Sequence, residues 1–180
     1  VSNPNLPLLS GGTVFEAYSG PIEQSPGSIT VSRINTSTQF NNGRDGGPII
    51  LEASGDINVS GFLASWSSSV DDAGDGGMIS LSSGGNINIP NGGLNSSSLS
   101  FVDNGRDGGM ISLSSEGNID IFGSLNSSSF SFLGKAGGNG GIISLSSGGD
   151  IGISGNLDSS SSLSSGTVSG ESADGGMISL

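Results

Sequence analysis

Residues 76–81 read Gly-Gly-Met-Ile-Ser-Leu, and this block decides the fold because it returns along the chain. Close copies stand at residues 46–51, 108–113, 140–145 and 175–180, with a degenerate copy at 26–31. With the second glycine as marker, the steps between copies are 20, 30, 32, 32 and 35 residues. A period of about 32 residues is typical of a solenoid, in which each unit buries its apolar face by stacking on its neighbours.

Two further blocks accompany each copy at fixed offsets. Eight residues after the marker glycine comes Gly-Asn-Ile or Gly-Asp-Ile, and then a leucine that opens a serine-rich stretch. Apolar and polar residues alternate inside the blocks: Ile79 and Leu81 flank Ser80, and Leu99 and Phe101 flank Ser100. This period of two indicates short strands whose apolar side chains are buried and whose serines face solvent.

Short strands at fixed offsets predict an all-β fold, a parallel β-helix with about 30–35 residues and three short strands per coil. Equivalent residues of successive coils stack about 4.8 Å apart. The expected core ladders are Ile49-Ile79-Ile111-Ile143, Leu51-Leu81-Leu113-Leu145 and Ile57-Ile87-Ile119-Ile151. Ile29 and Val31 are placed at the heads of the first two ladders. We expect repeats over residues 27–180, truncated in mid-coil, and an irregular coil, loop or cap over residues 1–26.

Composition excludes several kinds of chemistry. The chain has no His and no Cys, so His- or Cys-based catalysis, zinc sites with those ligands, and disulfides are absent. Four Lys and Arg stand against sixteen Asp and Glu, a net charge of −12, which disfavours nucleic acid and anionic lipid as partners. No apolar run is long enough to span a bilayer. The chain starts at Val1 without a signal-peptide pattern, and we expect a mature product or a fragment.

Two polar columns are the candidate sites. Asp45, Asp75, Asp107 and Asp174, interrupted by Asn139, stand two residues before the marker glycines. Stacked carboxylates repel one another, so this column is a candidate calcium site, although Asx turns at a tight corner are the favoured explanation. Asp56, Asn86, Asn118 and Asp150 form the second column, for which we expect a structural ladder of stacked amides.

The serine runs and the isolated aromatic and acidic residues are weaker candidates. The runs at 67–69, 96–98, 127–129 and 159–162 predict a solvated hydroxyl face, with ice or polysaccharide as conceivable ligands. Trp66 is either a lateral packing contact or a sugar platform. Asp71 and Asp72 are adjacent and point to opposite faces of a strand, which does not suit a glycosidase pair.

The repeat resembles a known family. Units of Gly-Gly-x-Ile-x-Leu-x-Ser-x-Gly-[Asn/Asp]-Ile followed by Leu-[Asn/Asp]-Ser-Ser-Ser, as over residues 140–161, are similar to filamentous-haemagglutinin-like exoproteins. Within this family, the repeats are most similar to those of the large two-partner-secretion exoproteins that are abundant in cyanobacteria. The resemblance covers about residues 27–180. It implies a right-handed β-helix exported to the cell surface or secreted, in proteins that are mostly adhesins or structural filaments.

The sequence thus predicts a structural, non-enzymatic role. We expect a segment of an extracellular β-helical fibre or adhesin shaft, which stacks end to end on itself or on its own longer chain. The alternative is a surface module that binds glycans or calcium, and a polysaccharide-active enzyme is the weakest interpretation. No cofactor, nucleic-acid partner or membrane insertion is expected.

Overall fold

The computed structural model describes residues 15–19, 27–39, 43–102, 104–133, 137–164 and 174–180. Within these ranges every regular element is a β-strand, and the strands pair in parallel in three sheets. The described ranges contain no helix long and apolar enough to cross a membrane. Most of residues 1–26 lies outside them.

Each coil contributes strands to three sheets. Sheet I contains β1 (Phe15–Ser19), β4 (Ile49–Ala53), β7 (Met78–Ser83), β11 (Met110–Ser115), β15 (Ile142–Ser147) and β19 (Met177–Ser179). Sheet II contains β2 (Ile29–Asn35), β5 (Ile57–Ala64), β8 (Ile87–Ile89), β9 (Gly93–Asn95), β12 (Ile119–Ile121), β13 (Ser124–Asn126), β16 (Ile151–Ile153) and β17 (Leu157–Asp158). Sheet III contains β3 (Thr38–Gln39), β6 (Ser67–Ser69), β10 (Ser98–Ser100), β14 (Ser129–Ser131) and β18 (Ser161–Leu163).

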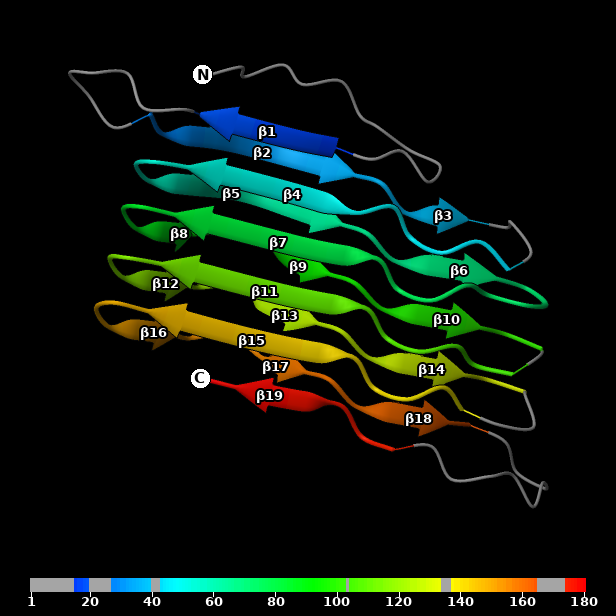
Figure 1. The fold of residues 1–180 in the computed structure, drawn as a ribbon. Coiled ribbons are helices and arrows are strands. Elements are labelled where there is room, and N and C mark those ends of the chain that lie inside the picture. The colour runs from blue at the N-terminus through cyan, green and yellow to red at the C-terminus, as the bar shows by residue number, and fades with distance from the viewer. Residues whose placement is uncertain (1–14, 20–26, 40–42, 103, 134–136, 165–173) are drawn as a thin grey trace.

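The coils wind in a right-handed sense. In Figure 1 the chain runs leftward along sheet I in front, turns behind, and returns rightward through sheets II and III while it descends from the N-terminal to the C-terminal end. Successive strands of each sheet come from successive coils, which gives the order β4–β7–β11–β15 in sheet I and β6–β10–β14–β18 in sheet III. The structure confirms the predicted all-β, right-handed parallel β-helix.

The aliphatic ladders lie between sheets I and II. One ladder in sheet I stacks Ile49, Ile79, Ile111 and Ile143 in register. Two residues further along each strand, a second ladder stacks Leu51, Leu81, Leu113 and Leu145. Ile57, Ile87, Ile119 and Ile151 form the facing ladder in sheet II. All of these side chains are buried in one cluster except Ile151, which is half-buried in the last complete coil. Burying an Ile or Leu side chain stabilises the fold by about 1.5–3 kcal/mol, so few apolar residues per coil suffice.

The start of the solenoid differs from the expectation. Ile29 and Val31 pair with Ile57 and Val59 in sheet II, so their placement at the heads of the Ile49 and Leu51 ladders is wrong. The strand next to β4 is β1, which lies inside residues 1–26 and aligns Phe15 with Ile49. Residues 26–31 are therefore a copy of the second block, and the short step of 20 residues disappears. Both blocks contain glycine followed by alternating aliphatic residues, so the pattern alone did not distinguish them.

A constriction divides the interior of each coil. At the constriction, the second glycine of each Gly-Gly pair in the front layer contacts a serine of the layer behind. Gly109 N–H donates to Ser96 C=O at 2.7 Å, and Ser96 Oγ donates to Gly77 C=O. The same N–H bond joins Gly77 to Ser65, Gly141 to Ser127 and Gly176 to Ser159. A Cβ on Gly108 would collide with the Ser127 carbonyl, so the close approach of the two layers requires glycine.

Beyond the constriction the core is made of serine. We call the space between sheet III and the returning segments, such as residues 71–75, the serine lobe. Its hydroxyls cross to backbone carbonyls of the facing layer: Ser98 Oγ to Gly74 C=O at 2.8 Å, and Ser129 Oγ to Arg106 C=O at 2.6 Å. No buried side-chain nitrogen or oxygen in the described ranges lacks a hydrogen-bond partner. The small size of serine lets the layers approach, and its hydroxyl satisfies carbonyls that would otherwise be buried unpaired.

Candidate functional site

The candidate calcium column is a chain of side-chain to backbone hydrogen bonds. Asp45 Oδ1 accepts from Asp75 N–H at 2.9 Å, and Asp75 Oδ1 accepts from Asp107 N–H at 3.1 Å. The pattern continues from Asp107 Oδ1 to Asn139 N–H at 2.7 Å and from Asn139 Oδ1 to Asp174 N–H at 3.1 Å. Each side chain thus holds the corner of the next coil, and Asn performs this task as well as Asp.

The electrostatics of the column agree with a structural role. Partial burial raises the pKa of Asp75 above its ordinary value, and the Asp45 and Asp107 carboxylates add to the effect; the hydrogen bond from Asp107 N–H and the nearby Arg106 oppose it. The described residues contain no group of three acidic side chains placed to hold a metal ion. Calcium binding at Asp45, Asp75, Asp107 and Asp174 stays a prediction, which the hydrogen bonds do not require.

The second column works in the same way at another corner. Asp56 Oδ1 accepts from Asn86 N–H at 2.7 Å, Asn86 Oδ1 from Asn118 N–H at 2.9 Å, and Asn118 Oδ1 from Asp150 N–H at 2.9 Å. The hydrogen bonds therefore run from side chain to backbone, whereas we expected amide to amide. An amide–amide bond does occur two residues on, where Asn88 Nδ2 donates to Asn58 Oδ1 at 3.0 Å.

The serine runs alternate between the two sides of the chain: Ser96, Ser98, Ser127 and Ser129 are buried, whereas Ser97 and Ser128 are half-buried and Ser160 and Ser162 are exposed. The predicted hydroxyl face at these positions is therefore wrong for the inward serines. Ser98 and Ser100 are 1% and 0% exposed, whereas Phe101, expected in the core, is 42% exposed. Phe132 is likewise 46% exposed, and its ring lies 6.5 Å from that of Phe130. The alternation was recognised correctly but assigned to the wrong faces, because an apolar residue is normally the buried one.

The outward hydroxyl array lies on sheet I instead. Ser80, Ser112 and Ser144 align in one column, and two residues along the strands Ser82, Ser114 and Ser146 align in a second. Their side chains are half-buried in the first column and exposed in the second. The signal was present in the repeated Ile-Ser-Leu-Ser, where the serines alternate with ladder residues.

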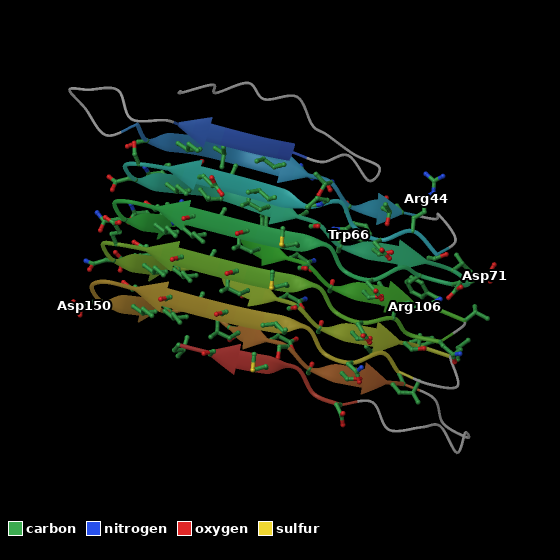
Figure 2. All side chains as sticks on the ribbon, viewed as in Figure 1. Arg44, Trp66, Asp71, Arg106 and Asp150 are labelled. Atoms are coloured by element: carbon green, nitrogen blue, oxygen red, sulfur yellow. The ribbon has the colours of Figure 1, made fainter. Side chains whose placement is uncertain are left out.

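The remaining sequence candidates are scattered. In Figure 2, Asp71, Arg44 and Arg106 lie at the edge where sheet III turns back, and Asp150 lies at the opposite edge. Asp72 forms an ion pair with Arg106, with Oδ1 and Nε 3.6 Å apart and both side chains about half exposed. Such a pair contributes little to stability. Trp66 is half-buried between β5 and β6, as expected for either lateral packing or an accessible ring.

Grooves indent the surface of the described coils, among them one over the glycine pairs and one on sheet II. One, of about 420 Å³, runs over the glycine pairs, with Asp75 and Asp107 on one side and Met78 and Met110 on the other. The second, of about 330 Å³, lies on sheet II beside Phe62 and above Ser124. Phe62 is 58% exposed in the middle of the solenoid. This position could not be singled out from the repeat, because the residues aligned with Phe62 in other coils are Arg33, Gly93 and Ser124.

Comparisons with protein-family models, curated proteins and solved structures gave no match to this chain. The resemblance to filamentous-haemagglutinin-like exoproteins therefore stays a prediction.

Proposed function

We propose that this chain is a structural segment of an extracellular β-helical fibre or adhesin shaft, without enzymatic activity. The observation that carries the proposal is the axial register: each sheet passes from coil to coil with equivalent residues paired, apart from a register shift between Val31 and Arg33 and a longer corner between β8 and β9. Backbone hydrogen bonds then run along the axis through all three sheets, and the corner columns add side-chain bonds in the same direction. Such an arrangement resists extension and bending. The extracellular location rests on the sequence resemblance.

A further coil could pair in the same register with the coil of β16, β17 and β18. In the coil above it, Ile119 N–H donates to Asp150 C=O at 3.0 Å, and Ser129 N–H donates to Ser160 C=O at 2.9 Å. Ile151 and Ser161 pair in register with Ile119 and Ser129, so we expect their N–H groups to face the position of a further coil. We propose that a coil of the same chain or of another copy accepts these bonds by strand addition.

Electron microscopy and sedimentation velocity over a concentration series test the assembly of separate copies. We expect rods that lengthen with concentration and a fibre-diffraction spacing of about 4.8 Å along the rod. Ser161→Pro removes the outward N–H together with the hydrogen bond from Ser161 Oγ to Gly138 C=O, and should leave a folded chain of somewhat lower stability that no longer elongates. Ser129→Pro is the matched internal change, which breaks an existing ladder bond and should lower stability.

Single-molecule pulling along the axis tests the shaft role independently of assembly. Because each coil is bonded to its neighbours, we expect stepwise peeling with contour increments of about 100 Å, the extended length of about 32 residues. Release of the whole chain in one low-force event would contradict a mechanical role, whether the segment belongs to a filament or to a longer chain.

A further inference from the structure

Phe62 leaves most of an aromatic ring exposed to solvent, where it adds little to the stability of the solenoid. The side chain is 58% exposed on β5, so most of its apolar surface remains in water. Its neighbours in sheet II are Arg33 in the preceding coil and Gly93 in the following one. Since glycine has no side chain, Gly93 does not cover the ring on the side of the following coil.

The groove beside the ring has a floor of backbone. Gly92, with φ of +82°, and Gly93 lengthen the corner before β9, and a Cβ on Gly92 would collide with the Gly61 carbonyl. The backbone of these two residues leaves a hollow of about 330 Å³ between Phe62 and Ser124. This volume is at the lower end of the range for small-molecule sites, where about one sugar unit fits.

Two asparagines supply oriented donors to the groove. Asn95 Oδ1 accepts from Ser97 N–H at 3.0 Å, and Asn126 Oδ1 accepts from Ser128 N–H at 2.9 Å. These Asx turns fix both amides by their oxygens, so the Nδ2 groups remain the donors toward a ligand. Both asparagines line the groove, as does Ser124, whose side chain is exposed.

We propose that this groove binds a neutral saccharide unit. A sugar ring presents C–H bonds on its faces, which pack on the negatively polarised face of an aromatic ring, and hydroxyls at its rim, which need donors and acceptors. The groove offers one aromatic ring, two amides and one hydroxyl, and no charged residue lines it. The net charge of −12 disfavours an anionic sugar, and the absence of a carboxylate from the lining disfavours a cationic ligand.

The test is a titration of the ¹⁵N-labelled chain, followed by NMR, with hexamers of cellulose, starch, mannan and xylan, and with a galacturonate hexamer as the acidic probe. We expect saturable shifts with at least one neutral hexamer, at concentrations up to about 10 mM, confined to amides of residues 92–95 and 124–126. Phe62→Ala should weaken binding roughly tenfold. Because Phe62 is largely exposed, this variant should fold normally.

Two further variants locate the site. Asn126→Asp removes the amide donors but keeps the turn, since Asp158 makes the same turn with Ser160 N–H at 3.0 Å; we expect binding weakened about three- to tenfold. Phe122→Ala is the control, because Phe122 is 65% exposed two coils further on, in the coil of Ser124 and Asn126, and does not line the groove. We expect less than about a twofold change there. The proposal is overturned if no neutral hexamer gives saturable shifts, if only galacturonate binds, or if Phe62→Ala and Phe122→Ala weaken binding equally.

Discussion

Replacing Ser98 by leucine tests whether the core of the serine lobe is truly polar. Ser98 is 1% exposed, and its Oγ lies 2.8 Å from the Gly74 carbonyl of the facing layer. Leucine has no room between layers this close, and overpacking of a core costs about 1–3 kcal/mol. The Gly74 carbonyl also loses its side-chain donor, which costs about 1–3 kcal/mol when the group stays buried. We therefore expect a loss of about 2–6 kcal/mol, a large share of the roughly 5–15 kcal/mol that stabilises a typical domain.

Replacing the next residue, Leu99, by serine should be tolerated. Leu99 is half-buried on the outer side of sheet III and is flanked in register by Ser68 and Phe130, so serine fits its position. Because only part of the leucine leaves an apolar environment, Leu99→Ser should cost about 1 kcal/mol. Ser97→Leu is a second outward control, for which we expect less than about 1 kcal/mol.

Urea unfolding of the three variants, followed by circular dichroism and by the fluorescence of the single tryptophan, measures these costs. Both probes are needed because repeat proteins do not always unfold in one step. A stable Ser98→Leu variant beside a strongly destabilised Leu99→Ser variant would show that the apolar side chains face inward, and would refute the serine lobe.

Five further substitutions and a chelation experiment test the core, the constriction and the corner column. Ile111→Asp should abolish the folded circular dichroism signal because it buries an unpaired charge, while Ser112→Asp on the outer face of the same strand should lower the urea midpoint only slightly. Gly108→Ala should lower the melting temperature strongly through its collision with the layer behind, whereas Gly175→Ala, with no atom within 4 Å of the added Cβ, should leave it unchanged. The raised pKa of Asp75 means that the folded chain binds this proton more tightly than the unfolded chain, so its contribution to stability falls as pH rises through the folded pKa. Asp75→Asn should then be as stable as the parent or more stable at pH 7, by less than about 1 kcal/mol, and the difference should vanish below about pH 4. Chelation of calcium should leave the melting midpoint unchanged; a lower midpoint would support a metal in the Asp45 column.

The repeat predicted the solenoid because period, offsets and alternation are properties of the sequence alone. Stacking puts equivalent residues in register, so the ladder of Ile79, Ile111 and Ile143 followed from their spacing. The block to which residues 26–31 belong did not follow from the sequence, since Ile29 fits the first block and the second equally well. Only strand pairing separates the two, and the tertiary contact of β1 with β4 decides it.

The faces of sheet III were not predictable from hydrophobicity. Ser98 and Ser100 are inward because the glycine constriction holds the two layers too close for larger side chains, and that distance is set by contacts between segments far apart in the chain. Leu99 and Phe101 are then forced outward by the period of two. The groove at Phe62 also depends on such a contact, because it exists only where Gly93 of the next coil aligns with the ring.

The two corner columns explain why Asp and Asn replace each other along the chain. Along both columns the shared interaction is an Oδ1 atom that accepts the next coil's backbone N–H, and both residues provide it. The hydrogen bond fixes the distance between coils whether or not the side chain is charged, as Asn139 shows beside Asp107. The charge at these positions is therefore not needed for the hydrogen bond and can contribute to hydration of the surface. The excess of acidic residues does not by itself imply a ligand. A site on this solenoid has to be sought where one coil departs from the repeat, and Phe62 above Gly93 is such a place.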